Sequence, residues 1–174
     1  MRVALGSDHA GFDLKERLKR FLDEVHVPYE DLGCPSREPV DYPDIAAAVS
    51  GRVVAGAVDR GIVICGTGIG MAIAANKVPG IRAAAPCSAE AVALARGHNN
   101  LNVLALGART TPADTACAFV RTFLDTPFDG GRHQRRIDKI AALEVGRTTG
   151  SGVRPSTGSG RGELAEPRGP KSEV

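Results

Sequence analysis

Residues 61–77, GIVICGTGIGMAIAANK, are the clearest indication of the fold class in this sequence. The first five residues form a continuous apolar run without polar alternation, which is typical of a strand buried on both faces. Glycines at 66, 68 and 70 then form a turn, and a helix is expected through 72–76. A buried strand that turns directly into a helix is the repeating unit of a parallel α/β protein.

The same unit recurs along the chain on both sides of this stretch. Alternating strands and helices joined by right-handed crossovers predict a parallel sheet covered on both faces. The fold class expected is therefore α/β, a Rossmann-like three-layer αβα sandwich with a five-stranded parallel sheet, plus a C-terminal helix. The expected strands are 2–6, 29–32, 61–65, 81–85 and 102–106, and the further helices are 14–25, 43–58, 88–96, 111–124 and 132–144.

Composition divides the chain of 174 residues into a body and a tail. Residues 1–145 carry equal numbers of basic and acidic side chains, so the net charge of +2 belongs to residues 146–174. That tail is rich in Gly, Ser, Thr and Pro, and its few apolar residues cannot offset the entropy of ordering. We expect one domain over 1–145 and a disordered tail over 146–174, either a docking peptide or a tolerated extension.

Several classes of protein are disfavoured by composition. A neutral body without tryptophan and with 4% aromatic residues offers little for nucleic-acid binding. No apolar run spans a bilayer and no signal peptide precedes the first strand, so we expect a cytoplasmic protein without membrane partners. The four cysteines have neither metal-ligand nor CxxC spacing, so we expect free thiols and no metal.

Polar residues follow two of the expected strands. The first strand leads into Ser7-Asp8-His9, and the third leads into Cys65 and its glycine turn. The common 2-1-3-4-5 strand order makes these strands neighbours at the point where the strand order reverses, and ligands bind at that edge of an open sheet. An acid, an imidazole and a thiol would then face one crevice.

The glycine turn and Cys65 each have two interpretations. The turn either presents backbone N–H groups to an anion or simply connects strand to helix; its GxGxG spacing after the third strand disfavours a dinucleotide site. Cys65 precedes a helix N-terminus, an environment that favours thiolate and a role as base, but a lone cysteine is also often a small buried apolar residue. Cys34, Cys87 and Cys117 are interpreted as structural.

Two further groups of polar residues are candidates for the site. His98 and Asn99 fall in the polar segment RGHNN, interpreted as a loop, where catalytic side chains are commonly placed but where solvated histidines are also common. Arg132 and Arg136 are four residues apart on the last helix, so both guanidinium groups project from one face. Such a pair suits a phosphate, although it could be a solvated basic face.

Taken in order, five motifs resemble a known family. They are SDHAGF at 7–12, DYPD at 41–44, CGTGIGMAIAANK at 65–77, HNNLNVLALGAR at 98–109 and GGRHQRRI at 130–137. Over about residues 1–145 the chain resembles the type B ribose-5-phosphate isomerase and galactose-6-phosphate isomerase family. The resemblance implies aldose–ketose isomerisation of a phosphorylated sugar without metal or cofactor. It also implies a homodimer or dimer of dimers with active sites at the subunit interface.

The resemblance further implies a role for each matching residue. Cys65 would be the base that moves a proton between C2 and C1 through an enediolate, with Thr67 in the catalytic set and His98 opening the sugar ring. Met71 stands where some relatives use a glutamate base, which favours the cysteine. The substrate contacts implied are Asp8, His9 and Tyr42, the turn residues Gly66, Gly68, Ile69 and Gly70, then Asn99 and Arg109, with Arg132 and Arg136 on the phosphate.

The identity of the sugar stays open at this point. Gly97, Asn100, Pro86 and residues 88–92 depart from the usual family pattern near the sugar-facing loop. Interconversion of ribose 5-phosphate and ribulose 5-phosphate, in the pentose phosphate pathway, is the leading expectation. The alternatives are allose 6-phosphate, galactose 6-phosphate or erythrulose 4-phosphate as substrate, or a non-catalytic sugar-phosphate sensor.

Overall fold

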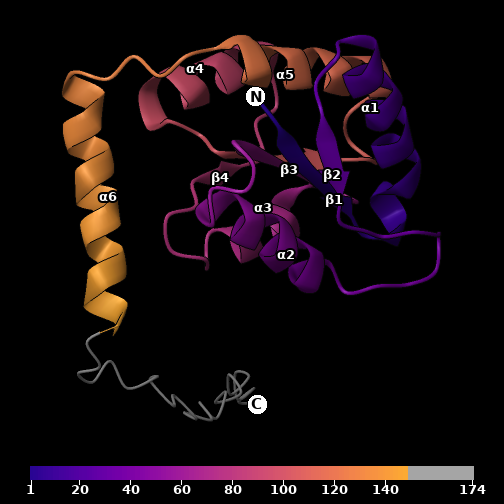
Figure 1. Ribbon diagram of the computed structural model, residues 1–174, viewed down its shortest axis with the longest axis horizontal. Helices are drawn as coiled ribbons and strands as arrows, with labels where there is room; N and C mark the ends of the chain where they lie inside the picture. The colour runs from indigo at the N-terminus through magenta and orange to yellow at the C-terminus, as the bar shows by residue number, and fades with distance from the viewer. Residues whose placement is uncertain (149–174) are drawn as a thin grey trace, which may run out of the picture.

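The computed structural model describes the backbone of residues 1–148 and the side chains as far as residue 144. Strands and helices alternate from the first strand to α5, and a sixth helix follows (Figure 1). The strands are β1 Val3–Ser7, β2 Tyr29–Asp31, β3 Arg60–Cys65, β4 Ala83–Ala84 and β5 Val103–Gly107. The helices are α1 Phe12–Glu24, α2 Tyr42–Val54, α3 Ile69–Ala75, α4 Ala89–Asn99, α5 Ala113–Asp125 and α6 Arg132–Thr148, and a 3-10 turn, η1, covers His9–Gly11.

All strand pairs are parallel, which confirms the predicted α/β fold with its five-stranded sheet. The strand order is β2-β1-β3-β5-β4, so the expected order 2-1-3-4-5 is wrong for the last two strands. The physical reason lies in burial: every residue of β5 is buried, as a central strand requires, whereas β4 has only two half-buried residues and suits an edge. The expected pairing of β1 with β3 is confirmed.

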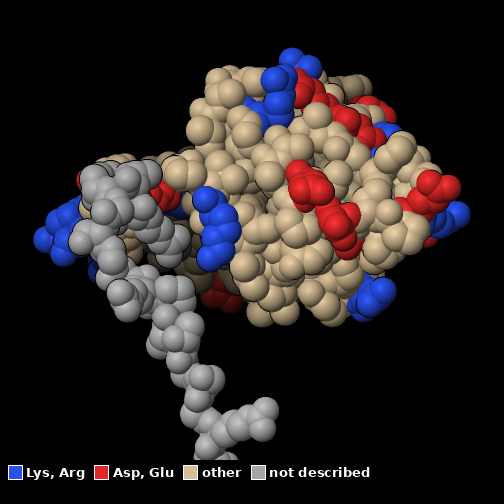
Figure 2. Space-filling model, turned by 90° about the horizontal axis from the view of Figure 1, so that it is seen from below, with Lys and Arg blue, Asp and Glu red and all other residues tan. Residues whose placement is uncertain are grey.

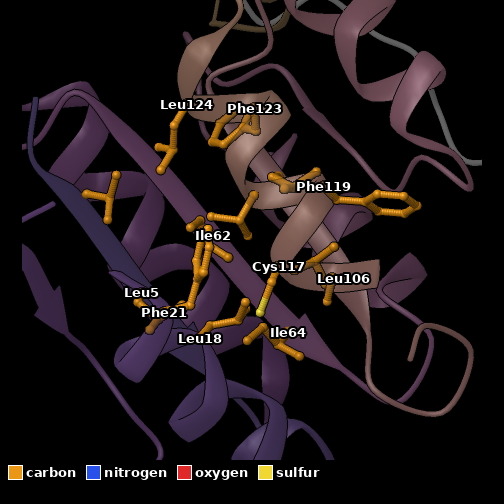
Figure 3. Packing of buried hydrophobic residues seen from close by; sticks show 14 of the residues in the cluster. Leu5, Leu18, Phe21, Ile62, Ile64, Leu106, Cys117, Phe119, Phe123 and Leu124 are labelled. Atoms are coloured by element: carbon orange, nitrogen blue, oxygen red, sulfur yellow. The ribbon is translucent and has the colours of Figure 1, made fainter. Parts of the chain in front are cut away.

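Two hydrophobic cores cover the two faces of the sheet. Leu5, Ile62 and Leu104 point to α1, α4 and α5, and this core includes Phe21 and Phe123 (Figure 3). Their neighbours in sequence point to the opposite face, against α2 and α3. Because successive side chains of a strand alternate between faces, the apolar run of β3 supplies both cores. Cys65 lies on the side of α2 and α3.

The edges of several elements differ from those expected. The strand predicted over 81–85 shrinks to β4, and the helix predicted over 43–58 ends at Val54. Pro112 precedes α5 as its N-cap residue instead of lying inside it. Ser88 caps α4 by accepting a hydrogen bond from the N–H of Ala91 at 3.1 Å.

The last helix, α6, extends beside α4 and away from the rest of the molecule (Figure 1). Of the three residues expected on its apolar face, Ile137 is buried, whereas Ile140 and Ala141 are exposed. The helix runs to Thr148, three residues past the expected domain boundary at 145. The rest of the expected tail, residues 149–174, lies outside the described residues.

No helix within residues 1–148 is both long enough and apolar enough to cross a bilayer.

Candidate active site

The turn after β1 packs directly on the end of β3. The N–H of Asp8 donates to the carbonyl of Ile64 at 3.1 Å, and the buried Asp8 carboxylate accepts from the N–H of Gly11 at 3.0 Å. A Cβ at Gly11 would come within 2.9 Å of the Ile64 carbonyl oxygen, so only glycine permits this approach. His9 is exposed beside this turn, and its Nδ1 accepts from the N–H of Val40 at 3.4 Å.

Cys65 ends β3 with its thiol held by the glycine turn. The N–H of Gly68 donates to Cys65 Sγ at 3.2 Å. Gly68 has a φ of 77°, a left-handed conformation that places this N–H toward the sulfur at the start of α3. The first N–H groups of a helix have no partner within the helix, so the turn offers donors beside the thiol. Thr67 is exposed, and its Oγ1 accepts from the N–H of Ile69 at 3.4 Å.

Two large side chains lie against glycines of this turn. A Cβ at Gly70 would meet the ring of Tyr42 at 2.9 Å, and one at Gly66 would meet the guanidinium of Arg109 at 3.4 Å. The backbone N–H of Arg109 also donates to the carbonyl of Gly66 at 2.9 Å. The structure therefore brings the residues around Cys65 together at the carboxyl edge of the sheet. This group, the Cys65 half-site, consists of Asp8, His9, Tyr42, Cys65, Gly66, Thr67, Gly68, Ile69, Gly70 and Arg109.

The other candidates form a second group at α4 and α6. His98 and Asn99 are the last two residues of α4, so their assignment to a loop is wrong. The helix continues through them because Asn100, with a φ of 48°, supplies the left-handed cap after them. Arg132 begins α6, and the neighbouring His133 stacks its ring on that of His98. We call His98, Asn99, Arg132 and Arg136 the His98 half-site.

Within one chain the two half-sites lie at opposite ends of the parallel strands. Arg82, which precedes β4, donates from its Nε to the carbonyl of Asn99 at 3.1 Å and accepts at its own carbonyl from the N–H of Asn102, just before β5. The end of α4 thus lies near the amino-terminal ends of β4 and β5, whereas Cys65 pairs with Gly107 at the carboxyl-terminal end of β5. A strand of five residues separates these two ends by roughly 13 Å.

His133 and Asp129 lie beside His98, and the sequence interpretation missed both. The ring centroids of His98 and His133 are 4.2 Å apart with planes at 7°. Asp129 Oδ2 lies 3.9 Å from His98 Nε2. Desolvation by burial, followed by the nearby His98, Arg132 and Arg136, lowers the pKa of His133. The motif GGRHQRRI contains His133, so this residue could have been noticed in the sequence. Nothing in the spacing of residues indicated that it would contact His98, 35 residues earlier.

A hollow of about 420 Å³ opens beside the glycine turn. Thr67 and Ile69 line it from the turn, and Cys87 and Phe119 line it from the α4 and α5 side of the molecule. Cys34 and Cys117 are buried, as expected of structural cysteines. Cys87 is exposed, so burial gives no support to the interpretation of Cys87 as structural. All four cysteines are free thiols, as predicted.

Comparisons with known proteins assign the class. The family model of ribose/galactose isomerases matches residues 3–140. Ribose-5-phosphate isomerase B of Escherichia coli is 44% identical over 146 residues, which cover 84% of this chain and 98% of that protein.

Solved structures agree with these matches. Clostridium thermocellum ribose-5-phosphate isomerase B superposes with a TM-score of 0.83 at 46% identity, over 84% of this chain and 99% of that one. The Mycoplasma genitalium ribose-5-phosphate isomerase B with bound ribulose 5-phosphate gives 0.80 at 42% identity, over 83% and 96%.

Fold, glycine turn and matches together define an enzyme of the sugar-phosphate aldose–ketose isomerase class. Within that class, the chain belongs to the ribose/galactose isomerase family, as the resemblance of its motifs predicted.

Proposed function

We propose that this chain interconverts ribose 5-phosphate and ribulose 5-phosphate, with Cys65 as the base. The observation that carries the proposal is the thiol of Cys65 at the end of β3, held at 3.2 Å by the N–H of Gly68. The similar E. coli and C. thermocellum proteins are both ribose-5-phosphate isomerases B, and the M. genitalium relative was solved with ribulose 5-phosphate bound.

The chemistry follows from this arrangement. The Cys65 thiolate removes the proton from C2 of the open-chain aldose, and the C1 carbonyl oxygen becomes an enediolate oxyanion. Within the turn, the N–H groups of Gly68 and Ile69 already donate to Cys65 Sγ and Thr67 Oγ1. The N–H groups of Gly66, Thr67 and Gly70 are suited to stabilise this oxyanion, at about 2.7–4 kcal/mol for each donor. Return of the proton to C1, with transfer of the O2 proton to O1, gives the ketose. In this proposal Thr67, exposed two residues after Cys65, belongs to the catalytic set, and Asp8 and His9 contact sugar oxygens.

Two copies of the chain would complete one site. In this proposal Cys65 acts on C2 and C1, and His98 acts on the ring oxygen, which is bonded to C1 in the cyclic sugar. Both side chains must therefore lie within hydrogen-bond reach of the same small region. The roughly 13 Å between the two ends of a five-residue strand keeps Cys65 and His98 of one chain too far apart to share one sugar in this way. We therefore propose a homodimer, or a dimer of dimers, in which His98, Asn99, Arg132 and Arg136 of one protomer meet the Cys65 half-site of the other.

The surface beside the Cys65 half-site is suited to such an interface. The face over α2 and α3 carries few charged side chains (Figure 2). Val54, Ile69 and Ile73 are each more than half exposed there. Ile140 and Leu143 of α6 are exposed as well. Burying such side chains against a second copy removes apolar surface from water, which stabilises the dimer by about 25 cal/mol for each Å² buried.

The experiment that tests the proposal is turnover on a panel of ribose 5-phosphate, allose 6-phosphate, galactose 6-phosphate and erythrulose 4-phosphate. Wild type is compared with Cys65→Ala and with the matched control Cys117→Ala, whose thiol lies in the opposite core. We expect ribose 5-phosphate to give the highest kcat/KM, no turnover in Cys65→Ala, and turnover near wild type in Cys117→Ala.

Other outcomes decide between the alternatives. A higher kcat/KM on another sugar would keep the mechanism and change the substrate. Turnover that survives in Cys65→Ala would remove the thiol as base. Phosphosugar binding without turnover on any sugar would support a non-catalytic sensor.

A further inference from the structure

Three side chains form a cluster at the junction of α4 and α6, and two of them have no role in the mechanism above. The rings of His98 and His133 are stacked, and Asp129 Oδ2 lies 3.9 Å from His98 Nε2. The His133 side chain is almost fully buried, although most of the described side chains of α6 are exposed. Such burial of one histidine against another requires an explanation.

The backbone places Asp129 beside the imidazole. The N–H of Asp129 donates to the carbonyl of Gly97 at 3.0 Å. A Cβ at Gly97 would come within 2.9 Å of Asp129 Oδ2, so glycine at this position leaves the room that the carboxylate occupies. His133 is fixed in turn, because its N–H donates to the carbonyl of Gly130 at 3.0 Å at the start of α6.

The composition of the cluster resembles that of a transition-metal site, but its geometry does not. Ligand atoms of the three residues lie within 4.8 Å of one another. An imidazole binds a metal along a lone pair in its ring plane, and the planes of His98 and His133 are nearly parallel and 4.2 Å apart, so their lone pairs do not converge. The nearby cations Arg132 and Arg136 also disfavour a metal ion.

The charges around the cluster favour one neutral ring. His133 faces His98, Arg132 and Arg136, with Asp129 as the opposing charge, and burial together with these cations lowers the pKa of His133. A neutral His133 can stack on His98 whether or not His98 carries a proton, because no second positive ring is brought close. His98, in contrast, lies beside the carboxylate of Asp129.

We propose that His133 and Asp129 are positioning residues for His98, holding its imidazole for the opening of a cyclic sugar. In that step the C1–O bond of the ring breaks, the ring oxygen gains a proton, and the C1 hydroxyl loses one as the aldehyde forms. The stacked ring of His133 restrains the plane of the imidazole, and the Asp129 carboxylate, 3.9 Å from His98 Nε2, favours the rotation that keeps Nε2 toward it. The inference rests on the proposed isomerase function and deepens it.

The test compares a cyclic with an acyclic substrate. Ribose 5-phosphate closes into a furanose, whereas erythrose 4-phosphate cannot, because the hydroxyl it would need is phosphorylated. We expect His133→Ala to lower kcat on ribose 5-phosphate about tenfold or more, a part of the 10²–10⁴-fold effect of a placed acid or base. Its kcat on erythrose 4-phosphate should change less than threefold. Asp129→Asn should show the same split.

Two further variants separate positioning from general damage. His133→Phe keeps a ring that can stack and should retain most of the activity that His133→Ala loses. In a His98→Asn background, His133→Ala should cause no further loss. The exposed neighbour Arg135→Ala is the matched control. Equal losses on both sugars, or additive losses in the His98→Asn background, would overturn the inference.

A failure of the proposed function would be distinguishable from these outcomes. Wild type would then turn over neither sugar. In that case, or if wild type turned over ribose 5-phosphate alone, NMR of the full chain decides the geometry. His133→Ala should move the ring-proton resonances of His98 by removing the ring current of its neighbour, while those of the distant His26 stay in place. Unchanged His98 resonances would overturn the stacking itself.

Discussion

Gly68 shows how a single residue builds the site. Its φ of 77° is costly for an L-residue, by about 1–2 kcal/mol. An added Cβ would also lie 2.9 Å from the carbonyl carbon of Leu106, which is backbone and cannot move aside easily. We predict that Gly68→Ala lowers the free energy of unfolding by at least about 1–2 kcal/mol. Turnover should fall too, because the N–H that holds Cys65 Sγ shifts.

The matched control is Gly51→Ala. Gly51 lies within α2, is exposed, and has no atom within 4 Å of an added Cβ. Alanine there should raise stability by about 0.5–1 kcal/mol. Urea unfolding and kcat of both variants check the pair. Equal stability changes in the two variants would show that neither φ nor space constrains position 68.

At the scale of elements, α1 is fixed to β2 by an ion-pair network. The Lys15 side chain is 1% exposed, and its Nζ lies 2.6 Å from Asp31 Oδ2. Lys19 Nζ lies 3.0 Å from the same oxygen. Burial of Asp31 opposes its ionisation, but hydrogen bonds from Lys15, Lys19 and the N–H of Gly33 outweigh burial and lower the pKa of the Asp31 carboxyl.

This network predicts a pH-dependent stability. A lowered folded-state pKa means that the contribution of Asp31 is full above its unfolded pKa, about 4, and is lost as the pH falls through the lower folded value. Asp31→Asn should therefore cost about 1–3 kcal/mol at pH 7. The difference from wild type should shrink below about pH 4. Urea unfolding from pH 7 down to pH 3 measures this difference, and a constant difference would contradict the prediction.

At the scale of the whole molecule, the separation of the half-sites predicts complementation between inactive variants. On ribose 5-phosphate, Cys65→Ala alone should be inactive, and His98→Ala alone should retain at most about 1% of wild-type turnover. After unfolding and refolding as a mixture, random pairing makes half of the dimers mixed, and each mixed dimer has one intact site, so about 25% of wild-type activity should return. No recovery from a mixture shown to contain mixed dimers would place both residues in one protomer's site.

The α/β class, the five strands and the position of Cys65 directly before a glycine turn could all be predicted from the amino-acid sequence. These features are local: apolar runs specify buried strands, and a positive φ specifies glycine. The pairing of β5 with β3 and the stacking of His98, near the end of α4, on His133 were visible only in the three-dimensional structure. These contacts join residues tens of positions apart, and packing between elements, not local pattern, determines them.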